Sequence, residues 1–474
     1  MCTEVAPRSL VARPALALAL ALALATPAGA QQPATPANPA PTPSPAGTVL
    51  PAPARSPVRL SLRDAVTAAS TTTPAVTVAV LQEEEARGRV TQARSIFFPT
   101  LTGAASFVRR TENLKSLGFS FNIPGVNFPN LIGPFNIWDF RPQVTQTLFD
   151  LSGWLRASAA RAQLTVSADQ AGTTGQTAAA QAGTAYVQAA RAAALVGARA
   201  EDVTLAGELI RDADAEFRAG VGTRLDVVRA RTQEAQARAS LEQARTELTQ
   251  AEIALARALG LPPGTRFALT DSLTAGLARS AAPEADAAAV TLALARRPEL
   301  AAAAAGVTAA RLSARATRAQ RLGRLELAGD YGYNGPQAND MIRTGQVAVQ
   351  YAIPFFQGFR TAGAVHEQDA LRREAEVRLA DLREQVAGEV GTAIAALASG
   401  VEQQHIAAEQ LALAQEELRE ARLRYTNGVS GNIDVITAQG DLVRARTATI
   451  EALAQTAQAR VQLARAVGVA PSLR

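Results

Sequence analysis

The sequence predicts a mainly α-helical chain that is built from two copies of one unit and that also contains four strands. Three observations indicate this fold class. Alanine, leucine, arginine and glutamate fill long stretches, whereas aromatic residues make up 4% of the 474 residues, a composition typical of long helices that pack on small side chains. A 44-residue segment recurs without a gap. Four shorter segments alternate apolar and polar residues, which is the period of a β-strand.

The repeated segment is 217–260, and its second copy, 208 positions later, is 425–468. A gapless match of this length indicates a duplication. Each copy contains an aromatic residue, a turn with glycine, an aspartate and then a long run rich in Ala, Arg and Glu. Each copy therefore predicts a helix, a tight turn and a returning helix. The matched positions include the turn glycines and the aspartates, Gly220 with Gly428 and Asp226 with Asp434.

Composition excludes several classes of function. The formal charge of +5 is spread along the chain, whereas a nucleic-acid-binding surface needs a concentrated basic stripe. The one cysteine, Cys2, and the two histidines, His366 and His405, are too few and too scattered for a metal site. The sequence has no nucleophile–base pair and no phosphate-binding glycine loop. We therefore expect no enzymatic activity, no cofactor and no nucleic-acid partner.

The N-terminus has the features of a secretory signal peptide over residues 1–30. Two arginines precede an Ala/Leu run at 15–25 that is too short to span a bilayer, and a small-residue cleavage site follows at 28–30. A retained membrane anchor is the alternative. Residues 31–57 are mostly Pro, Ala, Thr and Ser, which predicts a flexible leader.

The two copies are expected over residues 58–260 and 286–470, joined by a non-helical segment at 261–285. A helix of about 67 residues, roughly 100 Å long at 1.5 Å per residue, leads to each glycine turn. The return helices are expected to end well short of the strands. A helix at 298–321 can stack on the end of a return helix and extend from there to the level of the strands. Each copy opens with a short helix and then one that starts at a proline, at 61–70 and 74–95 in the first copy and at 286–297 and 298–321 in the second.

The alternating segments predict strands at 101–107, 140–148, 325–333 and 347–353. Each strand is about ten residues long, the length of a tilted transmembrane strand. The hairpin tips are expected to be a long, outward-facing loop at 109–138 and a short loop at 334–343. In the second strand Phe140, Val144 and Leu148 share the apolar face, and the polar face is formed by Arg141, Gln143, Thr145 and Thr147.

Two strands, a very long helix, a glycine turn and a shorter return helix, all duplicated behind a signal peptide, resemble the TolC-like outer-membrane efflux protein family. The resemblance is carried by the turns at 217–227 and 425–435 and extends over about residues 60–470. The strand-to-helix junctions at 148–150 and 354–356, and the helix-to-strand entry at 94–101, are also similar to those of the family.

This resemblance implies a homotrimer that forms an α-helical tunnel and shares a twelve-stranded β-barrel in the outer membrane of a Gram-negative bacterium. Barrel closure agrees, since four strands cannot close a barrel and an open sheet edge is not viable in lipid. The resemblance also implies a passive exit duct for efflux or type I secretion. Its partners would be a periplasmic adaptor protein, an inner-membrane transporter and the lipid of the outer membrane.

The resemblance assigns candidate functions to the turns and to the strands. In the family, carboxylates at the second tip ring the narrow end of the tunnel, which makes Asp434 and Asp226 candidates for the channel gate. The alternative is that each aspartate caps its return helix. The polar strand face is a candidate for lining the barrel lumen, and a solvated strand face is the alternative. The candidates for contact with the adaptor are Gly220, Val221, Gly222, Gly428, Val429 and Ser430.

Two other functions fit part of the sequence. A periplasmic adaptor also contains a helical hairpin, but adaptors usually carry one hairpin with flanking β-domains. A coiled-coil scaffold would explain the long helices but not the four strands. The exit duct accounts for both copies and for the strands.

Overall fold

The computed structural model describes residues 57–113, 116, 131–273 and 286–472. These residues belong to one compact unit, Pro51–Arg474. The expected signal peptide, almost all of the leader, most of the first hairpin tip and part of the connecting segment lie outside the described residues.

The described helices occur in the same order in the two halves of the chain, as the duplication predicts. In each half a short helix precedes one that begins at a proline, and a very long helix precedes a shorter return helix. The long helices contain 68 and 67 residues. The helices are α1 Leu62–Thr72, α2 Pro74–Arg94, α3 Leu151–Arg218, α4 Arg224–Ala258, α5 Asp286–Arg296, α6 Pro298–Ala319, α7 Arg360–Thr426 and α8 Asn432–Ala466, with 3-10 turns η1 Ser95–Phe97, η2 Gln320–Leu322 and η3 Ala470–Ser472.

One strand hairpin from each half contributes to a single antiparallel sheet. The register places apolar residues opposite one another: Leu101 pairs with Val144, and Leu327 pairs with Val349. One face of the sheet is therefore apolar and the other polar. Within the described residues each outer strand has a partner on one side only. The strand order is β2 Thr100–Asn113, β3 Leu131–Phe149, β5 Arg324–Gln337, β6 Asp340–Ala352.

The strands are longer than expected, so the predicted bounds of both loops are wrong. The four strands contain 14, 19, 14 and 13 residues and extend into the segments 109–138 and 334–343. Arg109 pairs with Asn136, inside the expected long loop. The residues 109–113 that lengthen β2 are all polar, and Gly133 and Pro134 interrupt the segment that lengthens β3, so neither extension has the alternation of a strand.

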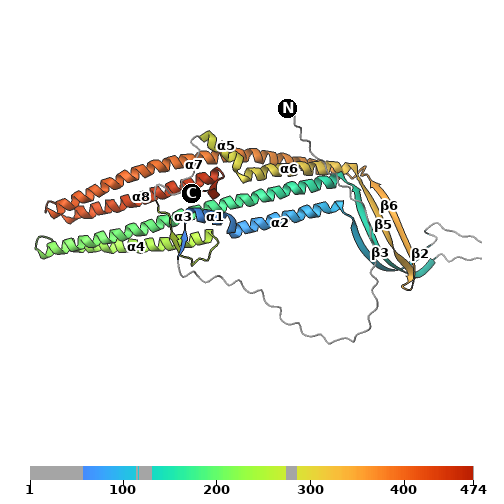
Figure 1. Ribbon diagram of the computed structural model, residues 1–474, viewed down its shortest axis with the longest axis horizontal. Coiled ribbons are helices and arrows are strands. Elements are labelled where there is room, and N and C mark those ends of the chain that lie inside the picture. Colours follow the sequence, from blue (N-terminus) through green and yellow to red (C-terminus); the bar gives the residue numbers. More distant parts are fainter. Residues whose placement is uncertain (1–56, 114–115, 117–130, 274–285, 473–474) are drawn as a thin grey trace, which may run out of the picture. The chain divides into compact units, whose positions relative to one another are not determined.

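Next to the sheet, the helices lie in the same order as the strands. α2 packs against α3, α3 against α6, and α6 against α7 (Figure 1). Further from the sheet the return helices cover the long ones: α4 packs on α3, and α8 packs on both α7 and α3. The row beside the sheet therefore has α2 at one border and α7 at the other.

Each return helix stops at a glycine and abuts a helix that continues toward the sheet, as expected for helix 298–321. Gly260 has a φ of +70°, and a Cβ on it would lie 3.0 Å from the ring of Pro74 at the start of α2. Gly468, with a φ of +80°, lies in the same way against Arg296 and Arg297, where α5 meets α6. Glycine is favoured because the left-handed conformation opposes a Cβ. Thus α2 continues the line of α4, and α6 continues the line of α8.

A short strand pair that the sequence did not indicate lies in the middle of the unit. β1 Val58–Leu60 pairs in parallel with β4 Phe267–Leu269. The described part of the expected connecting segment, residues 261–273, contains no helix and includes the strand β4. Leu60 and Phe267 contribute to the buried core at this level.

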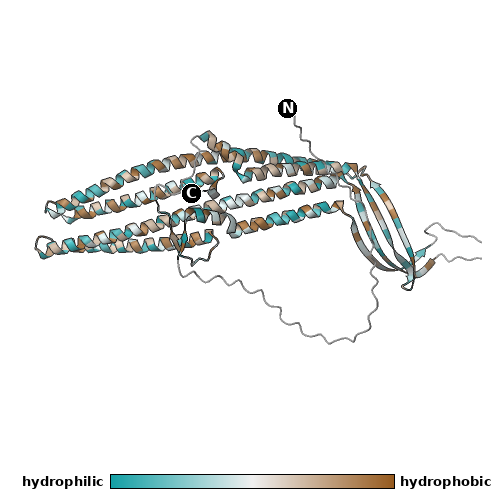
Figure 2. Cartoon of the chain, in the orientation of Figure 1, coloured by the Kyte–Doolittle hydropathy of each residue, from teal (hydrophilic) through white to brown (hydrophobic). Residues whose placement is uncertain are grey.

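Small side chains build most of this core. Ala179, Ala182 and Ala189 of α3 are fully buried, and alanine lets neighbouring helices approach closely. Apolar and polar residues alternate along the helices and strands (Figure 2). Among the described residues, no helix combines the length and the hydrophobicity needed to cross a bilayer.

Candidate functional site

The glycine turn of the first hairpin closes with a double hydrogen bond to one carbonyl. The carbonyl oxygen of Glu216 accepts from the amides of Val221, at 3.1 Å, and Gly222, at 3.0 Å. Gly220, between them and α3, has a φ of +78°. This is the Schellman arrangement, in which the residue after the helix takes the left-handed conformation.

The second turn repeats this geometry. The carbonyl oxygen of Arg424 accepts from the amides of Val429, at 2.9 Å, and Ser430, at 3.3 Å, and Gly428 has a φ of +68°. Apart from the adjacent residues in the chain, no atom of the described residues lies within 4 Å of the position that a Cβ would take at either turn glycine. Glycine is therefore required here by the backbone conformation and not by lack of space.

The two candidate gate aspartates have different surroundings. Asp226 forms a capping box with Thr223: its Oδ2 accepts from the Thr223 amide at 3.2 Å, and the Asp226 amide donates to the Thr223 hydroxyl at 3.3 Å. The same Oδ2 also accepts from the Thr223 hydroxyl at 2.6 Å. The N-cap of α8 is Gly431, which has no side chain to form such a box. Asp434 is exposed and forms no side-chain hydrogen bond or ion pair with the described part of the chain. The carboxylate of Asp226 thus stabilises α4, whereas that of Asp434 has no partner among the described residues.

Near the turns, the two hairpins are joined side by side by contacts that the sequence did not indicate. The Tyr425 hydroxyl donates to Glu216 Oε2 at 2.6 Å, and Asn432 Nδ2 donates to the carbonyl oxygen of Asp226 at 3.1 Å. Burial, followed by the hydrogen bond to Glu216, raises the pKa of Tyr425. The partners lie 209 and 206 positions apart, so no local pattern reveals them. The one signal is the hydroxyl itself, since the first copy has Phe217 at the matching position.

Apolar side chains project from both turns. Val221 is 79% exposed and Val429 is 68% exposed. Leu225 and Ile433, at the beginnings of the return helices, are also exposed. Exposed apolar patches on a protein surface commonly mark a site that another protein covers.

The residues predicted to share the polar strand face do share it, because Gln143, Thr145 and Thr147 pair with Asp330, Ala328 and Glu326. Arg141, on the same face, donates from Nε to Asp139 Oδ1 at 2.6 Å and from Nη1 to Asp330 Oδ1 at 2.8 Å. Two carboxylates around one guanidinium leave a net negative charge at this point of the sheet. The contact with Asp330 follows from the β3–β5 register, which the sequence alone does not provide.

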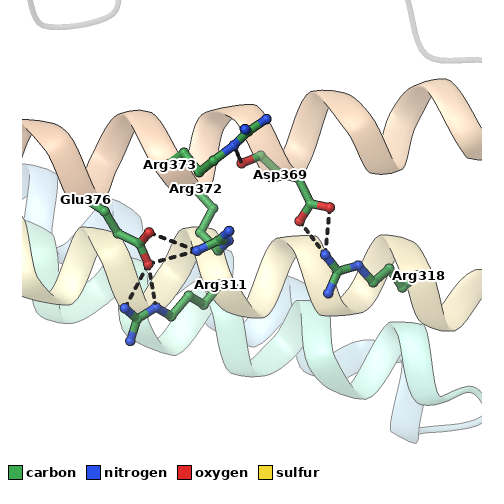
Figure 3. A network of polar contacts seen from close by, with 6 residues as sticks. All are labelled: Arg311, Arg318, Asp369, Arg372, Arg373 and Glu376. Atoms are coloured by element: carbon green, nitrogen blue, oxygen red, sulfur yellow. Dashed lines mark hydrogen bonds and ion pairs between the residues drawn. The ribbon is translucent and has the colours of Figure 1, made fainter.

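A network of ion pairs joins α6 to α7 beside the sheet (Figure 3). Arg318 Nη2 contacts both carboxylate oxygens of Asp369, at 2.5 and 2.6 Å. Arg311 donates to Glu376 Oε1 from Nε, at 3.1 Å, and from Nη2, at 2.8 Å, and Arg372 contacts both oxygens of Glu376. The hydrogen bond from Arg318 lowers the pKa of Asp369, and that from Arg311 lowers the pKa of Glu376.

The sequence also matches a known family. The family profile described as "Outer membrane efflux protein" matches residues 66–261 and 289–469, which is more than half of the chain. The chain belongs to the outer membrane efflux protein family. The two matched blocks correspond to the two copies of the repeat, so the predicted resemblance and the efflux-channel function it implies are confirmed. No curated protein sequence matches the chain.

Solved structures of the same fold come from several Gram-negative bacteria. A membrane protein from Pseudomonas aeruginosa is 21% identical with a TM-score of 0.74, over 86% of this chain and 93% of its own. The CmeC outer membrane channel of Campylobacter jejuni is 18% identical with a TM-score of 0.71, over 86% of each chain. The MtrE outer membrane channel of Neisseria gonorrhoeae is 20% identical with a TM-score of 0.65, over 86% and 88%. At these identities the likeness establishes the fold.

Proposed function

We propose that this chain is the exit duct of a tripartite efflux or type I secretion system in the outer membrane of a Gram-negative bacterium. The observation that carries the proposal is the sheet. Within the described residues its outer strands, β2 and β6, each pair on one side only, and one of its faces is apolar and exposed. In lipid every backbone polar group must be satisfied, so such edges require partners.

We propose that three copies supply those partners. Four strands from each chain give twelve in a closed barrel, with the apolar face toward lipid. The polar face, with Arg141, Gln143, Thr145 and Thr147, then lines the lumen. The long helices α3 and α7, which follow β3 and β6 in the chain, extend the duct away from the membrane into the periplasm.

The hairpin turns form the far end of this duct. In a trimer the three Asp434 carboxylates gather near the axis, and because they have no partner among the described residues they are available to act on passing ions. We infer that they favour cations at a narrow gate. The exposed Val221 and Val429 provide apolar contacts for the periplasmic adaptor. An inner-membrane transporter supplies the energy, so the duct itself is passive and catalyses no reaction.

Two measurements on the purified protein test the proposal. Outer-membrane fractionation with heat-modifiability on gels should yield an oligomer that dissociates on boiling, and planar lipid bilayers should show discrete channel openings. Recovery of the protein as a soluble periplasmic monomer would rule out the duct.

A further inference from the structure

The border helices of the row beside the sheet each have a face that no described residue covers. α2 buries Val76 and Ala79 against its neighbours, so residues two positions further on lie on the opposite side of the helix. These are Val78 and Leu81, which are 53% and 56% exposed. Glu85 and Arg89 continue the same stripe toward the sheet and form an exposed ion pair of 2.5 Å within α2.

The free face of α7 has a matching composition. Arg372 and Glu376 take part in the network that faces α6 (Figure 3), so Glu374 and Arg378 lie on the opposite side of the helix. They form an exposed ion pair within α7. Val377, beside them, is 67% exposed. Each border helix thus presents exposed valine and one Glu–Arg pair, away from the rest of its own chain.

The duplication sets the height of these two faces above the sheet. A shift of 224 positions carries Pro74 at the start of α2 onto Pro298 at the start of α6, and carries β2 onto β5 residue for residue. A shift of 208 positions relates α3 to α7. In one chain α3, from the first copy, packs against α6, from the second. In a ring of chains, α7 of one chain meets α2 of the next in the same relationship.

The observed contacts between α3 and α6 therefore predict the contacts between chains. A Cβ on Gly172 would lie 3.4 Å from Pro298, and one on Gly306 would lie 4.0 Å from Val166. Adding 208 to the α3 positions gives Ala380 and Glu374 of α7, and subtracting 224 from the α6 positions gives Pro74 and Gln82 of α2. The predicted contacts between chains are therefore Ala380 beside Pro74 and Glu374 beside Gln82. Val78 lies midway between positions 74 and 82, and Val377 lies midway between positions 374 and 380. The two exposed valines therefore come to the same height.

The same alignment brings opposite charges together. Arg89 is seven residues nearer the sheet than Gln82, about 10 Å along the helix. Helical side chains lean toward the N-terminus of their own helix. Because α2 and α7 run in opposite directions, Arg89 leans away from the sheet while Glu374 leans toward it, so the two converge. Glu85 and Arg378 converge in the same way.

We propose that neighbouring chains are held together beside the membrane by α2 of one chain and α7 of the next, through Val78 against Val377 and a reciprocal set of ion pairs, Arg89 with Glu374 and Glu85 with Arg378. The occupant of each free face is a second copy of this chain. The assignment rests on the proposed trimer and adds its residue-level contacts. The charges also define which faces can meet, since two α2 faces or two α7 faces brought together in parallel would oppose like charges.

Cross-linking tests the valine contact. Cys2 is the only cysteine of the sequence, so with Cys2→Ser as background the variant Val78→Cys/Val377→Cys should form disulfide-linked dimers and trimers on non-reducing gels. The matched control is Val80→Cys/Val377→Cys, because Val80 is exposed on a different side of α2 and should remain uncross-linked. An intact oligomer without covalent dimers in the first variant, or with equal cross-linking in the control, would overturn the assignment.

Charge reversal tests the ion pairs. The variant Glu85→Arg/Arg89→Glu keeps the pair within α2 but places like charges against α7 of the neighbour. We expect the dissociated fraction of the detergent-solubilised oligomer to rise roughly tenfold, because two attractive contacts at each interface become repulsive. Adding Glu374→Arg/Arg378→Glu restores complementarity and should restore the oligomer.

Native mass spectrometry of the unmodified protein separates the two proposals. If the unmodified protein is a monomer, both the trimeric duct and the interface between α2 and α7 are ruled out. If the unmodified protein is a trimer and the Glu85→Arg/Arg89→Glu variant has the same trimer fraction, the proposed duct is retained and the proposed ion pairs are overturned.

Discussion

Tyr425 of the second hairpin donates a 2.6 Å hydrogen bond to Glu216 of the first, so the end of α7 is fastened to the end of α3. Replacing Tyr425 with Phe removes the donor and leaves a carboxylate beside an apolar ring, at a cost of about 1–2 kcal/mol. We expect faster amide hydrogen exchange in both turns. Tyr351→Phe is the control, since its hydroxyl donates to the Leu322 carbonyl at the sheet end; equal exchange in the turns of both variants would contradict the role of Tyr425.

The contrast between the two aspartates predicts different consequences for the same substitution. Asp434→Asn removes a carboxylate that contacts no other side chain in the described part of the chain, so we expect weaker cation selectivity in planar bilayers and unchanged stability. Asp226→Asn weakens a capping box, so we expect a loss of about 1 kcal/mol in the free energy of unfolding and unchanged selectivity. Full cation selectivity and conductance in Asp434→Asn would refute the gate.

The turn glycines should respond to substitution through backbone conformation alone. Gly220→Ala places a Cβ on a residue with a φ of +78° in open space, which should lower the free energy of unfolding by about 1 kcal/mol. Gly207→Ala lies inside α3, also in open space, and should raise it by roughly 0.5–1 kcal/mol. Chemical denaturation of both variants checks the opposite signs; a stabilising Gly220→Ala would exclude a required left-handed turn.

The ion pairs between α6 and α7 should lose their effect in acid. The pKa of Asp369 is lowered from its usual 3.8 by Arg318, so its contribution to stability is complete above 3.8 and disappears as the pH falls through the lowered value. The thermal midpoint of the unmodified protein should exceed that of Arg318→Gln at pH 7, and the difference should shrink below pH 3.8. The difference should be small because Arg318 is exposed and Asp369 is only half-buried, so solvent screens the pair. A difference independent of pH would show that Arg318 acts by packing.

Tyr186 connects three segments in the middle of the unit. Its hydroxyl donates to the Leu60 carbonyl at 3.1 Å and lies 3.2 Å from Asp271 Oδ2, which also accepts from the Leu62 amide at 2.7 Å. Burial raises the pKa of Tyr186 to about 12, so the phenol remains protonated in neutral solution. Tyr186→Phe should cost about 1–2 kcal/mol, because the Asp271 amide, which donates to the Tyr186 hydroxyl at 3.2 Å, loses its acceptor, whereas the Leu60 carbonyl keeps its bonds from Thr270. Calorimetry measures this, and an unchanged midpoint would mean that water replaces the hydroxyl.

Helix positions followed from local chemistry, whereas strand ends did not. The prolines that begin α2 and α6 and the glycines that end α3 and α7 act within a few residues, so the sequence alone located these boundaries. The end of β2 depends on pairing between Arg109 and Asn136 in another strand. The residues at that end are polar and do not alternate with apolar ones, so their pattern predicts a loop where the structure has a strand.

The candidate site also has features that the sequence predicts and contacts that only the structure reveals. The sequence itself distinguishes the two aspartates. Three residues before Asp226 stands Thr223, which has a hydroxyl, whereas three residues before Asp434 stands Gly431, which has no side chain. The contact of Arg141 with Asp330 spans 189 positions and depends on strand register. The bond from Tyr425 to Glu216 depends on how two separate hairpins pack. Such contacts follow only from three-dimensional structure.

The breaks at Gly260 and Gly468 have a mechanical consequence. Of the described helices, only α3 and α7 run without interruption from the sheet to the turns. A push or twist at the turns can therefore reach the sheet along these two rods. The lines formed by α4 with α2 and by α8 with α6 are divided at the glycines and can slip there. A movement of the turns would therefore bend or rotate α3 and α7, while the return helices shift against α2 and α6 at the two glycines.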